Sequence, residues 1–337
     1  MNSILITGGA GFIGSNFIKL LLKSTQYKVV NYDVLTYSGN LENLKGLYDY
    51  PNYHFELGDI CDEKKVSEVI EQYEIDTIIN FAAESHVDRS IINSEPFLHT
   101  NILGVANLLN LTNKYHLEKF LQISTDEVYG SASSNETFTE DSNLNPNSPY
   151  SASKASADLL VHSYQQTFNT PALITRTTNN FGPYQYPEKF IPLIIANAFE
   201  NKKIPVYGDG SNIRDWIYVE DNCRALLSVL EKGKIGEIYN ISAKNEKTNL
   251  EIVKMILNLI GKSENLIEFV KDRPGHDKRY SISSDKIREN LAWQPQFTFE
   301  DALKNTLVWY RTHIAWLNNI IKRSNFSEFY LTQYKTI

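Results

Sequence analysis

Short apolar runs rich in β-branched residues alternate with longer amphipathic stretches through the first half of this chain. The runs predict strands at Ser3–Thr7, Lys28–Asp33, Tyr53–Leu57, Thr77–Ala83, Phe120–Thr125 and Ala172–Arg176. The stretches between them predict helices at Gly14–Lys23, Glu63–Glu74, Pro96–Tyr115 and Ser151–Phe168. Because strands that alternate with helices form right-handed βαβ crossover units, this order predicts an α/β fold with a parallel sheet covered by helices on both faces.

The residue composition and the pattern of apolar residues change after about residue 177. The segment 179–192, "NNFGPYQYPEKFIP", is rich in proline, aromatic residues and turn formers. Helical patterns follow at Ile191–Asn201, Asn249–Leu259 and Phe299–Lys322. We therefore expect residues 1–177 to form one domain and residues 178–337 to form mainly a smaller C-terminal lobe, with the chain crossing back into the first domain. The last helix has mixed apolar spacing, which favours a packing helix over one that lies on a membrane surface.

The net charge and the hydropathy of the sequence argue against several classes of function and location. A net charge of −7 argues against a nucleic-acid-binding surface. The opening residues "MNSILITGG" lead directly into a strand with no basic segment, so no signal peptide is expected. No apolar run reaches the roughly 18 residues of a membrane span. We expect a cytoplasmic protein that contacts neither membrane nor nucleic acid.

Cysteine and histidine placement gives no sign of a metal site. The two cysteines, Cys61 and Cys223, lie far apart and lack metal-ligand spacing, which fits a reducing compartment without disulfides. His86 and His276 also lack a partner histidine or cysteine at ligand spacing. We therefore expect both histidines to be hydrogen-bonding or structural residues, and the chain to hold no metal.

A glycine-rich segment, "ILITGGAGFIGSN", joins the first predicted strand to the first predicted helix. It contains G-x-G-x-x-G and G-x-x-G-x-x-G patterns that share Gly11 and Gly14. In this context glycines let the backbone approach a pyrophosphate at the start of the helix. Asp33 ends the second strand, where a carboxylate hydrogen-bonds an adenosine ribose and repels a 2′-phosphate, and this favours NAD over NADP. Asp59 ends the third strand and could meet the adenine amino group. Close strand–helix packing without a ligand is the alternative.

Two tyrosine–lysine pairs have the four-residue spacing that places both side chains on one helix face. A lysine ammonium beside a phenol stabilises the phenolate, which makes a general base or acid. Tyr150 and Lys154 follow the loop that leaves the carboxyl end of the strand Phe120–Thr125, where ligands bind in open α/β sheets. Tyr115 and Lys119 precede the same strand and lie at the opposite edge. Tyr150 and Lys154 are therefore the catalytic candidates.

The segment "STDEVYG" places two adjacent carboxylates, Asp126 and Glu127, directly after a buried strand. An unpaired buried carboxylate is costly, so such groups are usually neutralised, paired or used. A solvated turn is the ordinary alternative for an isolated Asp-Glu pair. With Thr125 these residues fall at the same sheet edge as Tyr150. A carboxyl pair beside a tyrosine and a nicotinamide suggests a second chemical step, such as proton abstraction next to a new ketone with loss of a leaving group.

The chain resembles the extended short-chain dehydrogenase/reductase superfamily, and within it the nucleotide-sugar 4,6-dehydratases. The resemblance covers essentially the whole length and is carried by "TGGAGFIGSN", "TYSGNLENL", "FAAESHVDRS", "STDEVYG", "SPYSASKASAD", "NNFGPYQYPEKFIP", "PVYGDGSNIRDWIYVEDNC" and "DRPGHDKRY". It implies a Rossmann-type doubly wound parallel sheet for NAD with a smaller mixed α/β C-terminal substrate lobe. The most discriminating segment is "TDEVYG", because related epimerases and decarboxylases generally carry other residues in place of the Asp-Glu pair.

The resemblance also implies a reaction. The implied substrate is dTDP-glucose, oxidised at C4, dehydrated across C5–C6 and reduced at C6 by tightly bound NAD, which is regenerated in each turnover. Tyr150 with Lys154 would remove the 4-hydroxyl proton while Thr125 hydrogen-bonds that oxygen. Glu127 would abstract the C5 proton, and protonated Asp126 would assist departure of the C6 hydroxyl. UDP-glucose as substrate, a sugar-nucleotide 4-epimerase and a non-catalytic NAD-binding protein remain alternatives.

The resemblance assigns binding positions as well. Cofactor contacts are implied at Gly8, Gly11, Phe12, Ile13, Gly14, Asp33, Val34, Leu35, Thr36, Asp59, Ile60, Phe81, Ala82, Ala83, Glu84, Ser85, Thr100, Tyr150, Lys154 and Asn180. Substrate contacts are implied at Ser85, Thr125, Asn179, Lys189, Phe190, Pro205, Val206, Tyr207, Arg214, Asn249, Asp272, Arg273, Pro274, Gly275 and His276.

Three further expectations concern the substrate and the assembly. Arg214 and Arg273 offer bidentate donors for a pyrophosphate, although a lone arginine is more often a surface charge. The tyrosine-rich stretch Phe181–Tyr186 could stack a base or form ordinary loop packing. The helices Pro96–Tyr115 and Ser151–Phe168 resemble those of a four-helix dimer interface, so a homodimer is expected.

Overall fold

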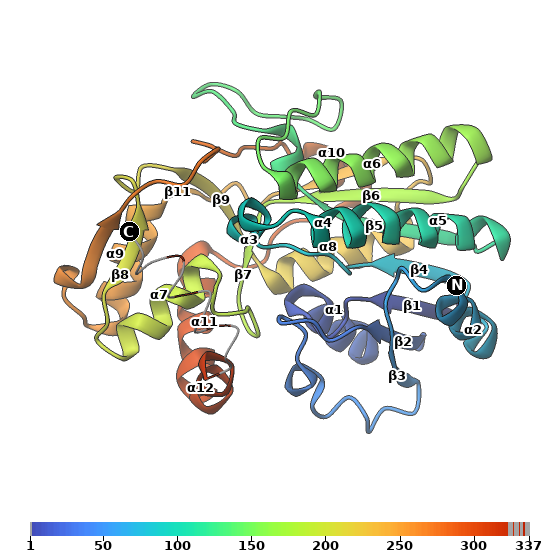
Figure 1. Cartoon of the computed structure of the whole chain (residues 1–337), viewed down its shortest axis with the longest axis horizontal. Helices are drawn as coiled ribbons and strands as arrows, with labels where there is room; N and C mark the ends of the chain where they lie inside the picture. Colours follow the sequence, from blue (N-terminus) through green and yellow to red (C-terminus); the bar gives the residue numbers. More distant parts are fainter. Residues whose placement is uncertain (1, 323–325, 327–329, 331–332, 334–337) are drawn as a thin grey trace.

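A seven-stranded parallel sheet forms the centre of the computed structural model, which describes residues 2–322, 326, 330 and 333 (Figure 1). Its strands are β1 (Ser3–Thr7), β2 (Lys28–Asp33), β3 (Tyr53–Leu57), β4 (Thr77–Asn80), β5 (Lys119–Thr125), β6 (Ala172–Thr177) and β10 (Ile238–Ile241). They lie in the order β10-β6-β5-β4-β1-β2-β3. The strand order reverses direction at β1, as in doubly wound folds. The predicted α/β fold with a Rossmann-type sheet is confirmed.

Alternation along the strands separates two hydrophobic layers. Ile4 and Ile6 pack on one face with helices α1 (Phe12–Ser24) and α8 (Val219–Lys232), whereas Leu5 packs on the other. That second face is covered by α2 (Glu63–Tyr73), α5 (Val105–Lys114) and α6 (Pro149–Phe168). Because both faces are buried, the strands are apolar on both sides, which is why they are visible in the sequence.

The second half of the chain contributes to both parts of the molecule. Helix α8 and strand β10 were not predicted from the sequence, yet both belong to the layers of the central sheet, as does α10 (Asp285–Leu291). The remaining elements form a second region, on the left in Figure 1. Its strands are β7 (Asn179–Phe181), β8 (Ile204–Tyr207), β9 (Ile213–Tyr218), β11 (Glu246–Thr248) and β12 (Ile267–Val270). Its helices are α7 (Phe190–Phe199), α9 (Asn249–Ile260), α11 (Phe299–Thr312) and α12 (Ile314–Ile321), and these elements enclose their own apolar core.

Two stretches predicted as single helices depart from a regular α-helix: the first is helical throughout but contains a π-helical turn, and the second is broken, so its prediction as one helix was wrong. The stretch predicted at Pro96–Tyr115 consists of α4 (Glu95–Leu98), a π-helical turn (His99–Gly104) and α5. The stretch predicted at Phe299–Lys322 breaks at His313, whose ring stacks on Trp309 with centroids 4.4 Å apart. Among residues 2–322, no helix combines the length and apolar character needed to cross a membrane.

A buried polar network joins α6 to the sheet. Arg176 on β6 donates to Asp158 of α6 (Nε to Oδ2, 2.8 Å) and to the Tyr129 hydroxyl (2.7 Å). Tyr129 in turn donates to Asn240 on β10 (2.9 Å), and all four side chains are at most 3% exposed. Tyr129 closes the short 3-10 turn Asp126–Tyr129 that follows β5. The network therefore fixes the position of that turn relative to α6.

Removing one partner of this network should leave a buried charge without compensation. We expect Asp158→Asn to lower the free energy of unfolding by about 3 to 5 kcal/mol, because Arg176 stays buried and cationic. Chemical denaturation measures this, with the exposed pair Lys64–Glu68 as control, where Glu68→Gln should change stability by less than about 1 kcal/mol. The double variant Asp158→Leu/Arg176→Met should lose less than Asp158→Asn alone, and a larger loss in the double variant would contradict this account.

Candidate active site

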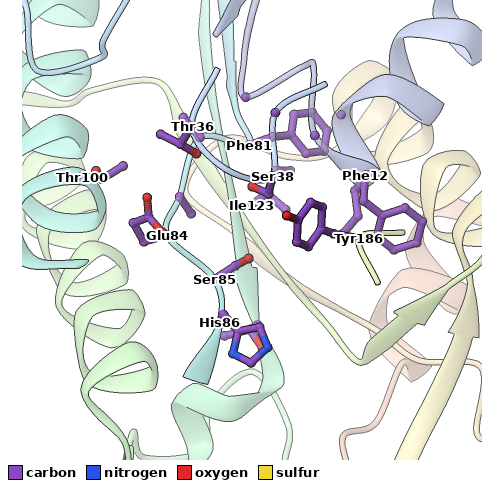
Figure 2. A pocket seen from close by; sticks show the side chains of 18 of the residues that line it. Phe12, Thr36, Ser38, Phe81, Glu84, Ser85, His86, Thr100, Ile123 and Tyr186 are labelled. Carbon is purple, nitrogen blue, oxygen red and sulfur yellow. The ribbon is translucent and has the colours of Figure 1, made fainter. Parts of the chain in front are cut away.

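A deep pocket opens at the carboxyl edge of the central sheet. Its walls are the segments that follow β1, β2, β3, β4, β5 and β6, together with the start of α6. Figure 2 shows Glu84, Ser85 and His86 along the segment that leaves β4, with Phe12 and Tyr186 across the pocket from them. This is the edge where ligands bind in open α/β sheets.

The glycine turn after β1 is shaped for close backbone approach. Gly8 has φ +68°, and a Cβ added there would lie 2.6 Å from the Ala82 backbone nitrogen. A Cβ on Gly14 would lie 2.5 Å from the Gly8 carbonyl oxygen. Gly11 caps α1 without a side-chain hydrogen bond, and the first turn of α1 carries no acidic residue. The first amides of α1 therefore face the pocket without a side-chain acceptor, an arrangement that suits a phosphate group.

Two carboxylates mark the ends of β2 and β3. Asp33 accepts hydrogen bonds from the backbone N–H groups of Ala10 (2.9 Å) and Leu35 (2.8 Å), which hold it at the pocket wall. Burial raises the pKa of Asp33, and those two hydrogen bonds oppose the rise. Asp59 accepts from the N–H of Cys61 (2.9 Å) and also lines the pocket. Both carboxylates thus lie where the sequence placed the ribose and adenine contacts.

The predicted cofactor residues line the pocket with one exception. Leu35 has φ +56° and packs against the core beside the sheet instead of lining the pocket. Its neighbours Val34 and Thr36 do line it. The Leu35 backbone nonetheless contributes, because its N–H donates to Asp33.

Tyr150 and Lys154 occupy the start of α6, which begins with a capping box at Ser148. Lys154 is 5% exposed, and its ammonium donates to the Ile123 carbonyl oxygen (2.7 Å). Burial lowers the pKa of Lys154 to about 8, opposed by Asp158 one turn further along the helix. Burial also raises the pKa of Tyr150, as do Glu127 and Asp126, while a hydrogen bond with Thr125 opposes the rise. The pair can hold or move a proton at the Tyr150 hydroxyl.

The carboxyl pair lies in an electrostatically asymmetric setting. Asp126 is 3% exposed, and burial, Glu127 and Asp215 raise its pKa well above the usual value. Its Oδ1 accepts a hydrogen bond from the Thr125 hydroxyl (3.2 Å), and Oδ2 has no partner among the described residues. These surroundings drive Asp126 towards its neutral, protonated form.

Glu127 faces cations instead. Burial raises its pKa, but Arg273, Lys189 and Arg214 all act against the rise. When the environments of two adjacent carboxyl groups differ in this way, one group can act as an acid and the other as a base. The solvated-turn alternative for this pair is excluded for Asp126 by its burial.

The predicted substrate residues fall into two groups. Ser85, Thr125, Asn179 and Lys189 line the pocket. The others lie outside its wall, at Phe190, Pro205, Val206, Tyr207, Arg214, Asn249, Asp272, Arg273, Pro274, Gly275 and His276. Two of this second group reach back to the first domain, since Arg273 pairs with Asp88 (3.0 Å) and Tyr207 donates to the same carboxylate (3.1 Å).

Several pocket residues were not predicted from the sequence. Tyr37 and Ser38 follow β2, and the Tyr37 ring meets the Tyr186 ring edge-on with centroids 5.5 Å apart. The Arg89 guanidinium lies over the Tyr37 ring, 4.1 Å from the ring centroid. The signal was present in the segment "TYSGNLENL", which carried the resemblance but received no binding role beyond Thr36.

One part of the tyrosine-rich stretch Phe181–Tyr186 lies at the pocket, and the rest forms ordinary packing. Tyr186 lines the pocket, whereas Phe181 packs in the second core against Trp216 and Tyr218. Tyr184 packs against Trp309 of α11 and lies beneath the Lys19 ammonium. The stretch is therefore mostly core packing, with one ring at the pocket.

Three sequence-based predictions remain, for the Tyr115–Lys119 pair, for His86 and for His276. Tyr115 ends α5 and Lys119 begins β5, so this pair lies away from the pocket at the amino edge of the sheet. His86 lies 3.2 Å from the Glu188 carbonyl oxygen, and burial lowers its pKa to about 3. His276 pairs with Asp272 (2.6 Å), and burial lowers its pKa to about 4. Both histidines are held neutral in hydrogen bonds.

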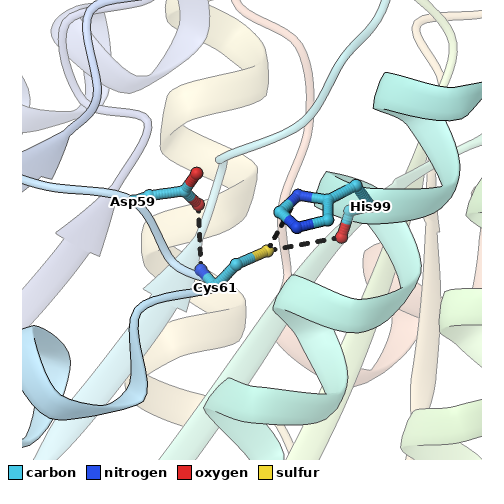
Figure 3. Close-up of side chains that lie close together, drawn as sticks. All are labelled: Asp59, Cys61 and His99. Atoms are coloured by element: carbon cyan, nitrogen blue, oxygen red, sulfur yellow. Dashed lines mark hydrogen bonds between the residues drawn. The ribbon is translucent and has the colours of Figure 1, made fainter.

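One group of potential metal ligands occurs among the described residues. Asp59, Cys61 and His99 converge beside the pocket although His99 is 38 positions from Cys61 in sequence (Figure 3). The Cys61 sulfur lies 3.4 Å from both Nδ1 and the carbonyl oxygen of His99. Burial raises the pKa of the Cys61 thiol to about 12, with Asp59 adding to the rise, so the side chain is a protonated thiol.

Comparisons with known proteins find close similarity to 4,6-dehydratases along most of the chain. The chain matches the family described as GDP-mannose 4,6 dehydratase over residues 5–306. The low-salt glycan biosynthesis protein Agl12 of Haloferax volcanii is 53% identical over 307 residues, covering 91% of this chain and 98% of that protein. The dTDP-glucose 4,6-dehydratase of Neisseria meningitidis is 47% identical over 345 residues, covering 96% and 97%. The solved structure of dTDP-glucose 4,6-dehydratase from Bacillus anthracis in complex with NAD superposes with a TM-score of 0.89 at 49% identity, covering 95% of this chain and all of that one.

Proposed function

The chain belongs to the GDP-mannose 4,6 dehydratase family, and we propose that it converts dTDP-glucose to dTDP-4-keto-6-deoxyglucose with NAD as a tightly held cofactor. The observation that carries this function is the carboxyl pair Asp126–Glu127 beside Tyr150. Its asymmetric charge environment supplies the acid and the base that loss of water requires.

The pocket residues fit NAD on three observations. The glycine turn leaves no room for side chains where a pyrophosphate would approach, and α1 presents its first amides there. Asp33 offers a carboxylate to a ribose, which disfavours a 2′-phosphate. Asp59 and Thr100 border the end of the pocket suited to adenine. NAD, when bound, supplies the redox chemistry by accepting hydride from C4 of the glucosyl ring and returning it to C6.

In the first step the protein removes a proton. The Tyr150 oxygen takes the proton of the 4-hydroxyl, and Thr125, which hydrogen-bonds Tyr150, orients the same oxygen. The Lys154 ammonium, anchored on the Ile123 carbonyl, favours the phenolate form of Tyr150. C4 leaves this step as a ketone, which makes the neighbouring C5 proton acidic.

In the second step the carboxyl pair eliminates water. Glu127, kept basic by its three cationic neighbours, takes the C5 proton. Asp126, kept neutral by burial, gives its proton to the C6 oxygen as the C6–O bond breaks and water leaves. Glu127 then returns its proton to C5 as C6 is reduced. Tyr150 gives up the proton that it took from the 4-hydroxyl and Asp126 regains one, so the enzyme is restored and the product differs from the substrate by one water.

We assign the nucleotide sugar mainly to residues 178–337 and NAD mainly to residues 1–177. Arg214 and Arg273 both act electrostatically on Glu127, so their positive charge lies near the second-lobe side of the pocket, where it would favour a diphosphate. Lys189 is anchored on the Ser85 carbonyl at the junction of the two regions. These roles, and those of the other substrate residues named above, are part of the proposal.

Two alternatives make different demands on the site. A 4-epimerase would use Tyr150, Lys154 and NAD but would leave Asp126 and Glu127 without a task. A non-catalytic NAD-binding protein would need neither pair, although both are present. The dehydratase is the function that uses every titratable group gathered around Tyr150.

The decisive experiment follows product masses with no cofactor added. We expect the purified protein to convert dTDP-glucose to a product lighter by one water, faster than it converts UDP-glucose. If neither mass changes, the assay is repeated with NAD, which separates lost cofactor from wrong chemistry. Conversion to a galacto isomer at unchanged mass would replace the dehydratase with an epimerase.

Substitution of the carboxyl pair should separate oxidation from elimination. We expect Asp126→Asn and Glu127→Gln to lower kcat by about 10² to 10⁴, because each removes one proton-transfer group. Both should still give the absorbance of reduced nicotinamide on mixing with dTDP-glucose, whereas Tyr150→Phe should lose this signal. Glu68→Gln on the exposed face of α2 serves as control with unchanged rate. Variants of the pair with near-normal kcat would contradict their roles.

The pH dependence of kcat/KM should have an alkaline limb that belongs to Lys154. Its pKa of about 8 means that the ammonium is present below that pH and is lost as pH rises through it, so the rate should fall there. The acid limb should come from Glu127, whose raised pKa means that the carboxylate is lost as pH falls. Lys154→Arg keeps its charge, so its alkaline limb should move to higher pH. An unmoved limb would assign it to another group.

We also propose that two copies associate through α6 and the helical segment formed by the π-helical turn His99–Gly104 and α5, which pack side by side (Figure 1). Leu103 in that turn and Leu159 on α6 are each 59% exposed. Sedimentation should give the mass of a dimer for the native chain and of a monomer for Leu103→Glu/Leu159→Glu. Val308→Glu, at an equally exposed position on α11, should stay dimeric. A native monomer would refute this assembly.

The cellular compartment is part of the same proposal. Cys61 and Cys223 are free thiols, as expected in a reducing compartment. We place the protein in the cytoplasm, where cell fractionation should recover it.

A further inference from the structure

We propose that Asp59, Cys61 and His99 form a binding site for a thiophilic divalent cation, of which zinc is the representative. Asp59 and Cys61 follow β3, and His99 begins the π-helical turn between α4 and α5. Figure 3 shows the three side chains facing a common point between these two segments. The spacing of residues along the chain does not reveal this group, because the fold alone brings His99 to Cys61.

The distances suit a tetrahedral metal. One ligand atom from each residue lies within 4.8 Å of the other two, and the Cys61 sulfur is 3.4 Å from Nδ1 of His99. Bonds of about 2.3 Å to sulfur and about 2.0 Å to nitrogen at a tetrahedral angle place those two atoms about 3.5 Å apart. The Cys61 sulfur and the His99 nitrogen are therefore already close to the separation that a shared metal requires. The N–H of Cys61 holds Oδ1 of Asp59 at 2.9 Å, which leaves Oδ2 to coordinate.

The chemistry of the three donors points to a cation of the zinc kind. A thiolate, an imidazole and a carboxylate with one further position open to solvent are ligands that zinc accepts. The thiol proton is displaced when the metal binds. Two further acidic groups, Glu56 and Asp62, lie in the same neighbourhood, although Lys65 pairs with Glu56 at 3.3 Å. Short π-helical turns like the one at His99 occur frequently at functional sites, which is a second reason to assign a task to this turn.

The cation site and the pocket share a residue. Asp59 lines the pocket and belongs to the ligand group, and Thr100, next to His99, also lines the pocket. Under the proposed function this is the adenine end of the NAD site. A cation that draws Asp59 away would therefore compete with NAD for the unloaded protein. This consequence rests on the proposed function, whereas the cation site itself does not.

Cadmium titration tests the site directly, because a cadmium–thiolate bond absorbs in the ultraviolet. We expect the full-length chain, after its NAD has been removed, to show this absorption with saturation at one equivalent of Cd²⁺, and Zn²⁺ to displace it. The two cysteines provide a matched control. Cys61→Ser should abolish the absorption, while Cys223→Ser, a change in the core beside α1 that is only 2% exposed, should keep it. Thermal unfolding of each variant verifies that it is folded.

The outcomes decide each part separately. Absence of the absorption, or its persistence in Cys61→Ser, would overturn the site. His99→Gln should weaken Cd²⁺ binding at least tenfold, and a smaller change would overturn the three-ligand site. Added NAD should weaken Cd²⁺ binding, and a failure to do so would overturn the competition while the absorption itself still reports the site. Because the absorption needs no turnover, a failure of the proposed dehydratase activity would be seen independently.

Discussion

The parallel register of β1, β4, β5 and β6 is the constraint on which the pocket depends. β4 ends with Asn80 beside Gln122, whereas β5 continues three residues further and pairs with β6 as far as Thr125 beside Thr177. The end of β5 therefore extends past its shorter neighbour and exposes one flank to the pocket. Ile123, Ser124 and Thr125 become wall residues for this reason, and the turn that follows places Asp126 and Glu127 at the same level.

Buried charges near this edge are used in two different ways. Arg176 and Asp158 neutralise each other, and with Tyr129 they fix the angle between α6 and the turn that carries the carboxyl pair. Asp126 has no such counter-charge in contact and is left to become neutral. The first arrangement gives rigidity, and the second keeps a proton available where a leaving group needs one. A proton donor of this kind is reliable only if its position is fixed, so the structural ion pair supports the chemical pair.

The sequence predicted six of the seven strands of the central sheet, because most of their residues are apolar or β-branched and buried; β10 was missed. It also predicted which side chains gather around Tyr150, since residues that directly follow parallel strands must meet at one edge. It failed where a local feature interrupts a regular pattern, as at His313, which stacks on Trp309 and ends α11, and it gave no sign of the π-helical turn after Leu98. Contacts between distant segments were also out of reach. Tyr37 against Tyr186 and Cys61 against His99 depend on tertiary packing that no spacing along the chain encodes. The assignments of the substrate residues beyond the pocket wall stay predictions.

The asymmetry between Asp126 and Glu127 depends on both halves of the chain. Adjacent carboxyl groups buried after one strand would both be driven to the neutral form by desolvation alone. The cations that act against this at Glu127 are Lys189, Arg214 and Arg273, and all three come from the second half of the sequence. Asp88, on the helix Val87–Ile92 of the first half, holds Arg273 by an ion pair, so the junction also helps to position one of these charges. The proposed division of acid and base between Asp126 and Glu127 therefore depends on the junction between the two regions, although both carboxyl groups belong to one of them.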